Sequence, residues 1–284
     1  MQKTDARNIE NLSISIVLYK TEEKEVRHII EQLALTKLTH KLYLIDNSPT
    51  NDIKNKLSLN DKVIYKHIGK NLGFGAGHNI AINLAKDNFE FHLVLNVDVI
   101  FKVEILQEIY DYMASHTDIG LLSPKIYNLD GSLQYSVKLL PTPFNLIVRR
   151  FIPVKSLKER LNYNYELKFF NFKDIIEPPY VSGCFMFINT KVFENVFGFD
   201  ERFFMYPEDI DLTRRIFKKY KVIYYPFATI YHAHGKGSYK NKKLLYYHIT
   251  SMIKYFNKWG WFIDNDRKKI NNNLISKINK NQKN

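Results

Sequence analysis

The first hundred residues alternate short apolar runs with amphipathic segments, and this alternation constrains the fold more than any other feature of the chain. The apolar runs are rich in isoleucine, leucine and valine, which favours strands, whereas Val26, Ile29 and Leu33 form one helical stripe. Strands and helices that alternate at these lengths predict a parallel, doubly wound α/β sheet with right-handed crossovers. The predicted strands are 12–19, 41–46, 62–67 and 91–95, and the predicted helices are 22–35 and 78–86.

The second half of the chain continues the pattern less regularly. It predicts a helix at 105–113, a strand at 119–126 and a hairpin turn at 128–131, where Asp-Gly is typical of such turns. Residues 140–179 contain prolines, aromatic residues and arginines without a clear period, which indicates a long excursion or lid rather than sheet. Further strands are predicted at 181–188, 222–225 and 229–231.

Composition places the chain among globular proteins. Of its 284 residues, 45% are apolar and 14% are aromatic, which is enough to fill a substantial core. Its single cysteine, Cys184, excludes an internal disulfide framework and a cysteine-based zinc site, so we expect a reducing, cytoplasmic compartment and a core position for Cys184. The polar lead at 1–11 has no apolar signal region, and no window approaches the ~18 apolar residues of a membrane span. We therefore expect a soluble or peripheral protein.

Most of the net charge of +13 lies near the carboxyl terminus. Residues 236–284 hold twelve basic residues against Asp264 and Asp266, whereas the rest of the chain is nearly balanced. Aromatic residues accompany these lysines, a mixture that suits the anionic inner face of a membrane, where rings lie at headgroup depth. A solvated helical tail is the alternative, and nucleic acid is not predicted because no recognised binding motif accompanies the charge. The residues expected at the membrane are Lys240, Lys242, Lys243, Lys254, Lys258, Tyr255, Trp259 and Trp261.

An acidic helix start follows Pro207. Proline suits the first helical turn, and Glu208 and Asp209 follow it where the helix dipole favours negative charge. This pattern holds two carboxylates on a rigid element, which suits acid–base chemistry, although a well-capped surface helix would have the same sequence. We expect Leu212, Ile216 and Phe217 to face inward, and Asp211, Arg214 and Lys218 to lie on other faces of the helix.

A buried strand within residues 90–99 ends in Asn96-Val97-Asp98. A carboxylate at the carboxyl end of a central strand lies at the crevice where open α/β sheets bind ligands. Its oxygen atoms suit Mg²⁺ or Mn²⁺ holding a diphosphate, and the structural alternative is a simple turn residue.

A glycine-rich loop, Lys70-Asn-Leu-Gly-Phe-Gly-Ala-Gly-His-Asn79, joins a predicted strand to a predicted helix. Its three glycines let the backbone turn tightly and approach a ligand. The loop matches neither the Walker motif nor the spacing of the dinucleotide fingerprint, so alone it is also explained as a plain helix-entry turn.

Taken together, these segments resemble the inverting family 2 glycosyltransferases with the GT-A fold, and most closely their rhamnosyltransferase-like bacterial members. The order of the motifs carries the resemblance, which covers residues 12–240. In one departure, Asn96 replaces the first aspartate of the usual Asp-x-Asp and leaves one carboxylate and one neutral amide. The motifs are Ser15-Ile-Val-Leu-Tyr19, Asp46-Asn47-Ser48, Asn71-Leu-Gly-Phe-Gly-Ala-Gly-His-Asn79, Asn96-Val-Asp98, Ser182-Gly-Cys-Phe-Met186, Gly198-Phe-Asp-Glu-Arg-Phe-Phe204, Glu208-Asp209, and His232 with Ser238.

The resemblance implies a set of site residues. It assigns the nucleotide to Asp46 and Asn79, a divalent metal, Mg²⁺ or Mn²⁺, to Asp98, and the role of catalytic base to Asp209. The predicted catalytic residues are Asp209 and Glu208, the predicted metal ligands are Asp98, His232 and Asn96, and the predicted nucleotide-sugar contacts are Tyr19, Asp46, Asn71, Gly73, Asn79, Asn96, Asp98 and Arg215.

The expected chemistry explains why these residue types are needed. An acceptor hydroxyl loses its proton as it attacks the anomeric carbon, and the Asp209 carboxylate can take that proton. The leaving nucleoside diphosphate gains negative charge, which a divalent cation held by Asp98 and His232 can stabilise. A packed histidine is the alternative for His232, and His234 is the less favoured ligand.

We therefore predict an inverting, metal-dependent glycosyltransferase. It would move a sugar from a nucleoside diphosphate donor to a hydroxyl of a glycan or lipid-linked glycan in cell-surface polysaccharide biosynthesis. The resemblance suggests dTDP-rhamnose, and UDP- and GDP-linked sugars remain open. The predicted divisions are a lead at 1–11, a nucleotide-sugar-binding half at 12–127, an acceptor-binding and catalytic half at 128–238, and a basic aromatic tail at 239–284.

Two rival functions remain. A catalytically silent nucleotide-sugar-binding or scaffold protein is favoured by Asn96 and opposed by the Glu208-Asp209 pair. A sugar nucleotidyltransferase would need a glycine-rich loop with a lysine near the amino terminus, and residues 12–25 contain no such loop. The sequence does not specify an oligomeric state.

Overall fold

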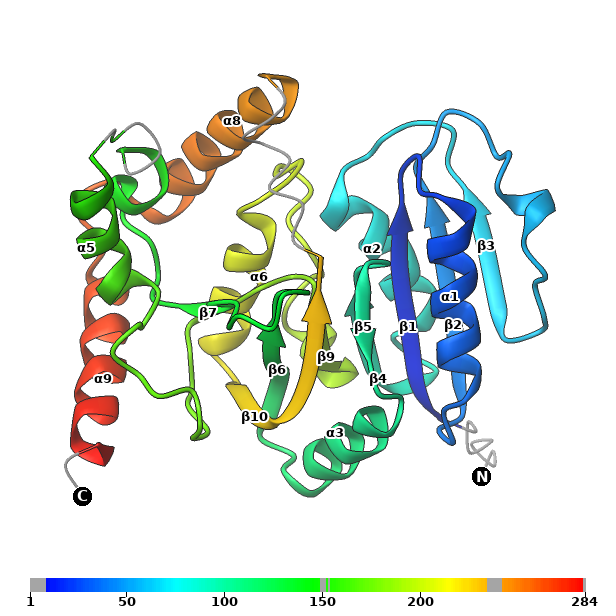
Figure 1. Cartoon of the computed structure of the whole chain (residues 1–284), viewed down its shortest axis with the longest axis horizontal. Coiled ribbons are helices and arrows are strands. Elements are labelled where there is room, and N and C mark those ends of the chain that lie inside the picture. The colour runs from blue at the N-terminus through cyan, green and yellow to red at the C-terminus, as the bar shows by residue number, and fades with distance from the viewer. Residues whose placement is uncertain (1–8, 149–151, 153, 234–241, 283–284) are drawn as a thin grey trace, which may run out of the picture.

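A mixed, mostly parallel sheet forms the centre of the molecule. The computed structural model describes residues 9–148, 152, 154–233 and 242–282. The strands are β1 (Glu10–Leu18), β2 (His40–Asp46), β3 (Val63–His67), β4 (Phe89–Leu95), β5 (Val99–Phe101), β6 (Ile119–Tyr127), β7 (Val137–Lys138), β8 (Tyr180–Val181), β9 (Phe185–Asn189) and β10 (Lys221–His232). Eight of them form one sheet in the order β3-β2-β1-β4-β9-β6-β10-β5, and β7 pairs with β8 separately (Figure 1).

The direction of the strands divides the sheet into two parts. On one side, β3, β2, β1 and β4 are parallel, which confirms the arrangement predicted from the alternating strands and helices. Strand β9 then runs antiparallel between β4 and β6, and β10 continues in parallel beside β6. The short edge strand β5 is antiparallel to β10. Residues far apart in the chain are thereby joined in one sheet.

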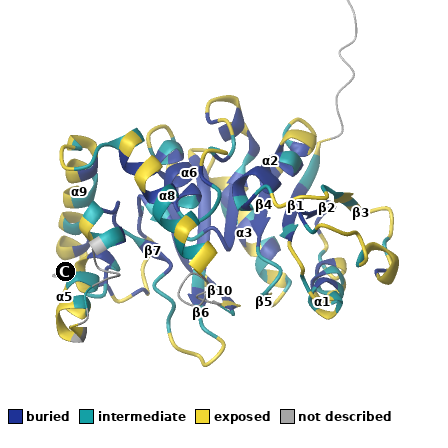
Figure 2. Ribbon diagram, turned by 90° about the horizontal axis from the view of Figure 1, so that it is seen from above, coloured by how far each residue is buried: buried dark blue, intermediate teal, exposed yellow. Residues whose placement is uncertain are grey.

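Helices cover both faces of this sheet. They are α1 (Glu23–Ala34), α2 (Phe74–Ala85), α3 (Glu104–Ser115), α5 (Lys155–Tyr165), α6 (Glu208–Phe217), α8 (Lys242–Trp259) and α9 (Asn265–Asn281). The apolar sides of α1 and α3 share one core with Leu93, whereas α6 shares the opposite core with Val94. Neighbouring strand residues thus face opposite cores, as the pleat of a strand requires. Figure 2 shows the buried strands lying between these layers.

Several element boundaries differ from the sequence prediction. Helix α2 begins at Phe74 rather than at residue 78, because Gly73 turns the chain with a φ of 89° and the Phe74 N–H bonds to the Phe204 carbonyl at 3.2 Å. Strand β4 ends at Leu95, as predicted, whereas the strand predicted at 181–188 is divided into β8 and β9. The two short strands predicted at 222–225 and 229–231 are one strand, β10, with an irregularity in its pairing between them.

The described residues of the segment 140–179 form an integral part of the molecule. The segment leaves the main sheet, as predicted, and contains α5 and a π-helical turn at Phe144–Val148. However, Leu140, Leu167 and Phe172 are buried in the same core as α6. The apolar residues that looked irregular in the sequence therefore contribute to the core beside the small β7–β8 sheet.

The carboxyl-terminal tail packs against the body, and the membrane position predicted for its aromatic residues is wrong for two of them. Tyr255 is fully buried, and the half-buried Trp259 donates its indole N–H to Asp211 at 2.8 Å. Helix α6 also differs from prediction, because Asp211 and Arg214 are buried against this tail. None of the described helices combines the length and apolar composition that a membrane crossing requires.

Candidate active site

Polar side chains collect at the carboxyl edge of the parallel strands. Tyr19 follows β1, Asp46 ends β2, Asn96 follows β4 and His232 ends β10. Because these strands run in the same direction, the residues lie along one edge of the sheet. This edge is where open α/β sheets bind their ligands.

The Asp46 end of this edge borders a hollow of about 580 Å³, which Leu18, Lys20 and Pro49 also line. The Asp46 carboxylate is held in place, since it accepts a hydrogen bond from the Ser48 N–H at 2.8 Å and another from the Tyr65 hydroxyl. Burial of the ring raises the pKa of Tyr65, and the hydrogen bond to this carboxylate and its charge raise it further, so the hydroxyl stays a donor. Tyr19 is exposed at the same edge. The geometry suits a fixed acceptor for a ligand N–H or hydroxyl group.

The glycine loop closes tightly over the start of α2. The Asn71 side chain accepts a hydrogen bond from the Gly73 N–H at 2.9 Å. A Cβ atom on Gly73 would lie 2.2 Å from the Phe204 carbonyl oxygen, so the close approach and the positive φ both require glycine. The loop is thereby fixed against the segment that precedes α6.

Asn96, Asp98 and His232 come together, as predicted. The His232 Nε2 atom lies 3.3 Å from Asn96 Nδ2 and 3.4 Å from Asp98 Oδ1, and His232 Nδ1 lies 3.2 Å from Gln134 Oε1. Burial disfavours the imidazolium, but contacts with Asp98 and Cys184 outweigh it and raise the pKa of His232 to about 10. The residues that the structure describes contain no cluster of three or more His, Cys, Asp or Glu side chains for a metal.

This trio nevertheless fits a divalent cation that a diphosphate would help to hold. Its donor atoms are a carboxylate oxygen, an amide oxygen that a rotation of the Asn96 amide would present, and an imidazole nitrogen. Mixed oxygen and imidazole ligands suit Mn²⁺ as well as Mg²⁺. A cation here would take the place of the proton that His232 shares with Asp98.

Glu208 and Asp209 begin α6 in different surroundings. The Asp209 carboxylate accepts hydrogen bonds from the N–H groups of Gly183 at 3.1 Å and Ile210 at 2.7 Å, and from the Tyr180 hydroxyl at 3.4 Å. Glu208 is only 5% exposed, and its Oε2 atom has no hydrogen-bond partner among the residues that the structure describes. Burial, with the neighbouring Asp209 charge, raises the pKa of Glu208 well above its ordinary value, which favours the neutral acid.

Burial also raises the pKa of Asp209, to about 7. The Gly183 and Ile210 N–H groups, the charge of Lys138 and the Tyr180 hydroxyl oppose this rise. Asp209 therefore stays available as a proton acceptor at neutral pH, with a basicity matched to proton transfer.

One turn of the chain links the two halves of the site. The Gly183 N–H binds the Asp209 carboxylate, while the carbonyl of the next residue, Cys184, accepts a hydrogen bond from the Asn96 N–H at 2.9 Å. A Cβ atom on Gly183 would lie 3.2 Å from Asp209 Cβ, so the close approach favours glycine. The candidate base and the candidate metal ligands are therefore held beside each other.

Two of the residues predicted to bind the nucleotide-sugar donor, Arg215 and Asn79, form hydrogen bonds within the protein itself. Arg215 pairs with Asp211 at 2.7 Å and donates to the carbonyl groups of Phe197 and Gly198. The Asn79 amide bonds to the N–H and carbonyl of Phe199 at 2.7 and 2.9 Å. These contacts brace the fold, and the roles of both residues in donor binding remain predictions. His234 and Ser238 lie outside the described residues.

Sequence reasoning missed several residues that support the site. Gly183 lies within a motif that the sequence singled out, and Tyr65 lies on a predicted strand, so both had a local signal. Gln134, Lys138 and Tyr180 had none, because only the folded chain brings them to His232 and Asp209.

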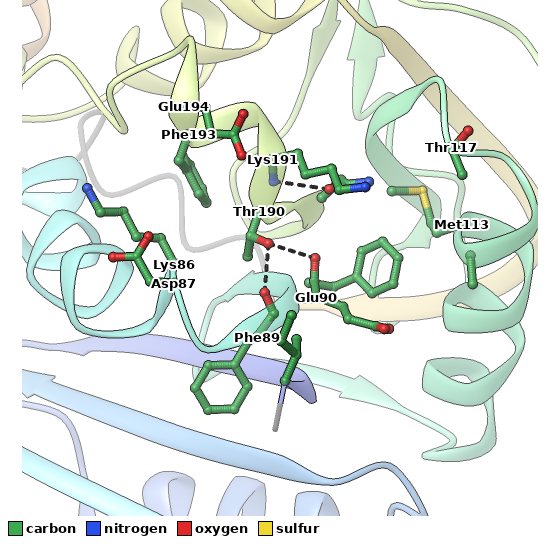
Figure 3. Close-up of a pocket in the computed structure, with 14 residues that line it drawn as sticks. Lys86, Asp87, Phe89, Glu90, Met113, Thr117, Thr190, Lys191, Phe193 and Glu194 are labelled. Carbon is green, nitrogen blue, oxygen red and sulfur yellow. Dashed lines mark hydrogen bonds between the residues drawn. The ribbon is translucent and has the colours of Figure 1, made fainter. Parts of the chain in front are cut away.

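A second hollow, of about 550 Å³, lies at the opposite edge of the sheet (Figure 3). It is lined by residues at the start of β4 and the end of β9, among them Glu90 and Asn189. Thr190 closes it by donating to the carbonyl groups of Phe89 and Glu90. This hollow contains none of the predicted site residues.

A solved structure shares this architecture. The mannosyltransferase PcManGT from Pyrobaculum calidifontis, solved in complex with GDP-Man and Mn²⁺, matches with a TM-score of 0.56 at 13% identity. The match covers 87% of this chain and 65% of that chain. At this identity the likeness concerns the fold, which is the α/β GT-A fold with a mixed, mostly parallel central sheet.

The chain belongs to glycosyltransferase family 2. The family model, described as "Glycosyl transferase family 2", matches residues 13–197. The low-salt glycan biosynthesis hexosyltransferase Agl10 of Haloferax volcanii is 30% identical over 217 residues, which make up 75% of this chain and 64% of that protein. The rhamnosyltransferase WbbL of Escherichia coli is 26% identical over 258 residues, 84% of this chain and 90% of that protein.

A third relative is the N-acetylglucosaminyl-diphospho-decaprenol L-rhamnosyltransferase of Mycobacterium tuberculosis. It is 28% identical over 208 residues, 65% of this chain and 64% of that protein. The chain thus spans 64% of the length of the Haloferax and Mycobacterium relatives and 90% of the Escherichia relative.

Proposed function

We propose that this protein transfers a sugar from a nucleoside diphosphate donor to a glycan hydroxyl, with inversion at the anomeric carbon. The observation that carries the proposal is the turn at Gly183 and Cys184, which holds a carboxylate of raised pKa beside a trio suited to a cation. A single displacement needs a proton acceptor on one side of the anomeric carbon and charge stabilisation on the other. The adjacent clusters supply both.

Asp209 acts as the base in this proposal. Its carboxylate takes the proton of the acceptor hydroxyl as that oxygen attacks the anomeric carbon, while the bond to the diphosphate breaks. The N–H groups of Gly183 and Ile210 fix its orientation. Glu208 is buried, and its raised pKa favours the neutral acid, which adds no second negative charge near the acceptor.

Asn96, Asp98 and His232 would hold a divalent cation. When bound, the cation would neutralise charge on the leaving diphosphate. Asp46 would bind the nucleoside, since its fixed carboxylate borders the hollow at the end of β2. The Mn²⁺ in the complex of the Pyrobaculum mannosyltransferase supports a metal-dependent reaction here.

The metal proposal predicts that Asp98→Ala and His232→Ala weaken donor binding without adding to each other. Two groups that serve one ion act as a unit, so the double variant should resemble the worse single variant. Calorimetry of donor binding with Mn²⁺ and with excess chelator measures this, and Asp130→Ala in an exposed turn is the control. Additive losses, or wild-type binding that ignores the chelator, would contradict a shared site.

For the donor, we propose dTDP-rhamnose. The two rhamnosyltransferases among the relatives support this choice, and the hexosyltransferase relative keeps UDP- and GDP-linked hexoses in the test. Thermal shift with a panel of dTDP-, UDP- and GDP-sugars, with and without Mn²⁺, identifies the donor, and release of nucleoside diphosphate shows turnover. A protein stabilised by a nucleotide sugar that it never cleaves would instead be a binding protein.

For the acceptor, we propose a glycan, free or lipid-linked. The names of the Haloferax and Mycobacterium relatives, one for glycan biosynthesis and one for a diphospho-decaprenol acceptor, support this class. A sugar nucleotidyltransferase is the alternative, and it would release pyrophosphate from a nucleoside triphosphate and a sugar 1-phosphate. Measuring both products in parallel separates the two reactions.

We also propose peripheral contact with the anionic inner leaflet through α8. Lys242 and Lys243 are exposed at its start, whereas Lys258 forms ion pairs with Asp200 and Asp211 and is therefore removed from the predicted membrane set. Each lysine near such a surface contributes about 1 kcal/mol, which added salt screens.

Replacing Lys242 and Lys243 with glutamine should therefore reduce sedimentation with phosphatidylserine vesicles and leave donor hydrolysis unchanged. Replacing the exposed Lys268 and Lys269 of α9 removes the same charge elsewhere and serves as the control. Equal vesicle binding by the wild type and the α8 variant would refute the contact.

A further inference from the structure

Tyr206 has a strained backbone immediately before the candidate base. Its φ is +90°, which lies beyond the left-handed values of 51° to 55° that three other non-glycine residues adopt. An aromatic residue with such a φ is an energetically costly outlier, and it persists only where the surroundings impose it. Outliers of this kind gather at ligand sites.

Backbone hydrogen bonds fix the chain on both sides of Tyr206. The Phe204 carbonyl accepts from the Phe74 N–H at 3.2 Å, and the Pro207 carbonyl accepts from the Asp211 N–H at 2.9 Å. The strained residue is thus held between the glycine loop and the first turn of α6.

The segment also lies beside Asp209. A Cβ atom on Gly183 would lie 3.2 Å from Asp209 Cβ and 3.3 Å from the ring of Phe74, so both side chains flank Gly183. Phe74 is in turn bonded to Phe204 through its N–H group. Phe204 is therefore one hydrogen bond away from Phe74, whose ring flanks Gly183 together with the candidate base, and Tyr206 lies three residues before that base.

Helix α8 brings two more rings to this segment. The rings of Tyr206 and His248 meet edge to face, with centroids 4.5 Å apart, and the rings of Phe204 and Tyr247 lie 4.1 Å apart at 32°. All four side chains are half-buried rather than enclosed in the core. We call Phe204, Tyr206, Tyr247 and His248 the aromatic cluster.

We propose that the aromatic cluster is the acceptor subsite, in which Tyr206 binds the apolar face of a pyranose ring. A pyranose has one face of C–H groups and a rim of hydroxyls, which suits an aromatic face with polar atoms at its edge. A free glycan and a lipid-linked glycan share this chemistry. The inference rests on the proposed glycosyl transfer and adds to it a location and a recognition element for the acceptor.

The strain at Tyr206 allows the side chain to be tested separately from the fold. Glycine adopts a φ of +90° without penalty, so Tyr206→Gly relieves the backbone while it removes the ring. If the tyrosine served only the fold, its loss would lower the melting temperature. For a ligand contact, we expect the melting temperature to be kept or raised, and the affinity for acceptor sugars to fall on the order of tenfold.

The probes are methyl glycosides of glucose, galactose, N-acetylglucosamine and rhamnose, titrated by ligand-observed NMR with the identified nucleoside diphosphate present. A second set of titrations uses N-acetylglucosaminyl-diphospho-decaprenol in detergent. Comparing the two sets shows whether the subsite prefers a lipid-linked glycan or a free one. His248→Ala tests the same subsite from α8 and should also weaken glycoside binding. Tyr163→Ala, an exposed tyrosine on α5, is the control and should bind like the wild type.

The outcomes separate this inference from the proposed function. Donor binding by the wild type that persists in Tyr206→Gly, together with weakened glycoside binding, supports the subsite. Unchanged glycoside binding in Tyr206→Gly, or a wild type that binds donor but no probe in either set of titrations, overturns the subsite alone. A wild type that binds no nucleotide sugar overturns the proposed function. If Tyr206→Gly does not fold, Tyr206→Asn, which also tolerates positive φ, replaces it.

Discussion

Asp209→Asn is expected to bind the donor as the wild type does but to lose a factor of roughly 10² to 10⁴ in transfer, the usual contribution of a positioned base. Asparagine keeps the size of the side chain, and its single carbonyl oxygen can still accept a hydrogen bond from one of the two N–H groups, of Gly183 or Ile210, which bond to different carboxylate oxygens of Asp209. It cannot take a proton from the acceptor. Calorimetry measures donor affinity, and the mass of the product measures transfer.

Glu208→Gln is the matched comparison. Because burial raises the pKa of Glu208 and favours the neutral acid, which glutamine copies, we expect transfer to fall less than tenfold. The reverse pattern, with a small loss in Asp209→Asn and a large one in Glu208→Gln, would move the role of base to Glu208.

The raised pKa of Asp209 also sets an expected pH dependence. Only the carboxylate accepts a proton, so the transfer rate should rise with pH through a midpoint near 7. Stability should depend on pH in the opposite direction, falling as the pH rises. An unfolded aspartate has a pKa of about 4, so the protonated folded form stabilises the protein at low pH and that contribution is lost as pH rises through 7. Asp209→Asn should therefore gain melting temperature over the wild type at pH 8 but not at pH 4.

The strand ends of the site could be predicted from the sequence because their signals are local. Asp46 and Asn96 each follow an unbroken apolar run, and the direction of parallel strands carries both to one edge. To group Asn96 and Asp98 with His232, the prediction needed in addition the family resemblance, because His232 lies far from them in the chain. The short distances from His232 to Asn96 and Asp98 agree with the proximity that the order of the motifs predicted.

The surroundings of α6 could not be predicted in the same way. Charged residues at helical spacing indicate a solvated face when only the helix is considered. The burial of Asp211 and Arg214 depends on Trp259 and Asp264, which lie 48 and 50 positions later in the chain. Similarly, the start of α2 was missed because glycines have low helix propensity, which the contact between Gly73 and Phe204 overrides.

The Arg214–Asp264 pair yields the largest expected effect on stability. The Arg214 guanidinium donates two hydrogen bonds of 2.7 Å to the Asp264 carboxylate, and the two side chains are 1% and 3% exposed. The guanidinium also lies 4.0 Å from the centre of the Trp259 ring. Asp264→Asn leaves this cation buried without its counter-charge, so we expect the free energy of unfolding to fall by about 3–5 kcal/mol. Denaturant unfolding at neutral pH measures the loss.

The substitution keeps the cap of α9, because Asp264 accepts the Arg267 N–H at 2.9 Å and asparagine caps a helix equally well, while it removes the charge and one of the two hydrogen bonds from Arg214. Asp266→Asn is the control, since the same change in the next turn breaks only an exposed ion pair with Lys218 and should cost less than about 1 kcal/mol. Similar small losses in both variants would mean that water reaches Arg214. A large loss confined to Asp264→Asn would mean that the carboxyl-terminal helices hold α6, and with it the Glu208–Asp209 pair at its other end, through one buried charge.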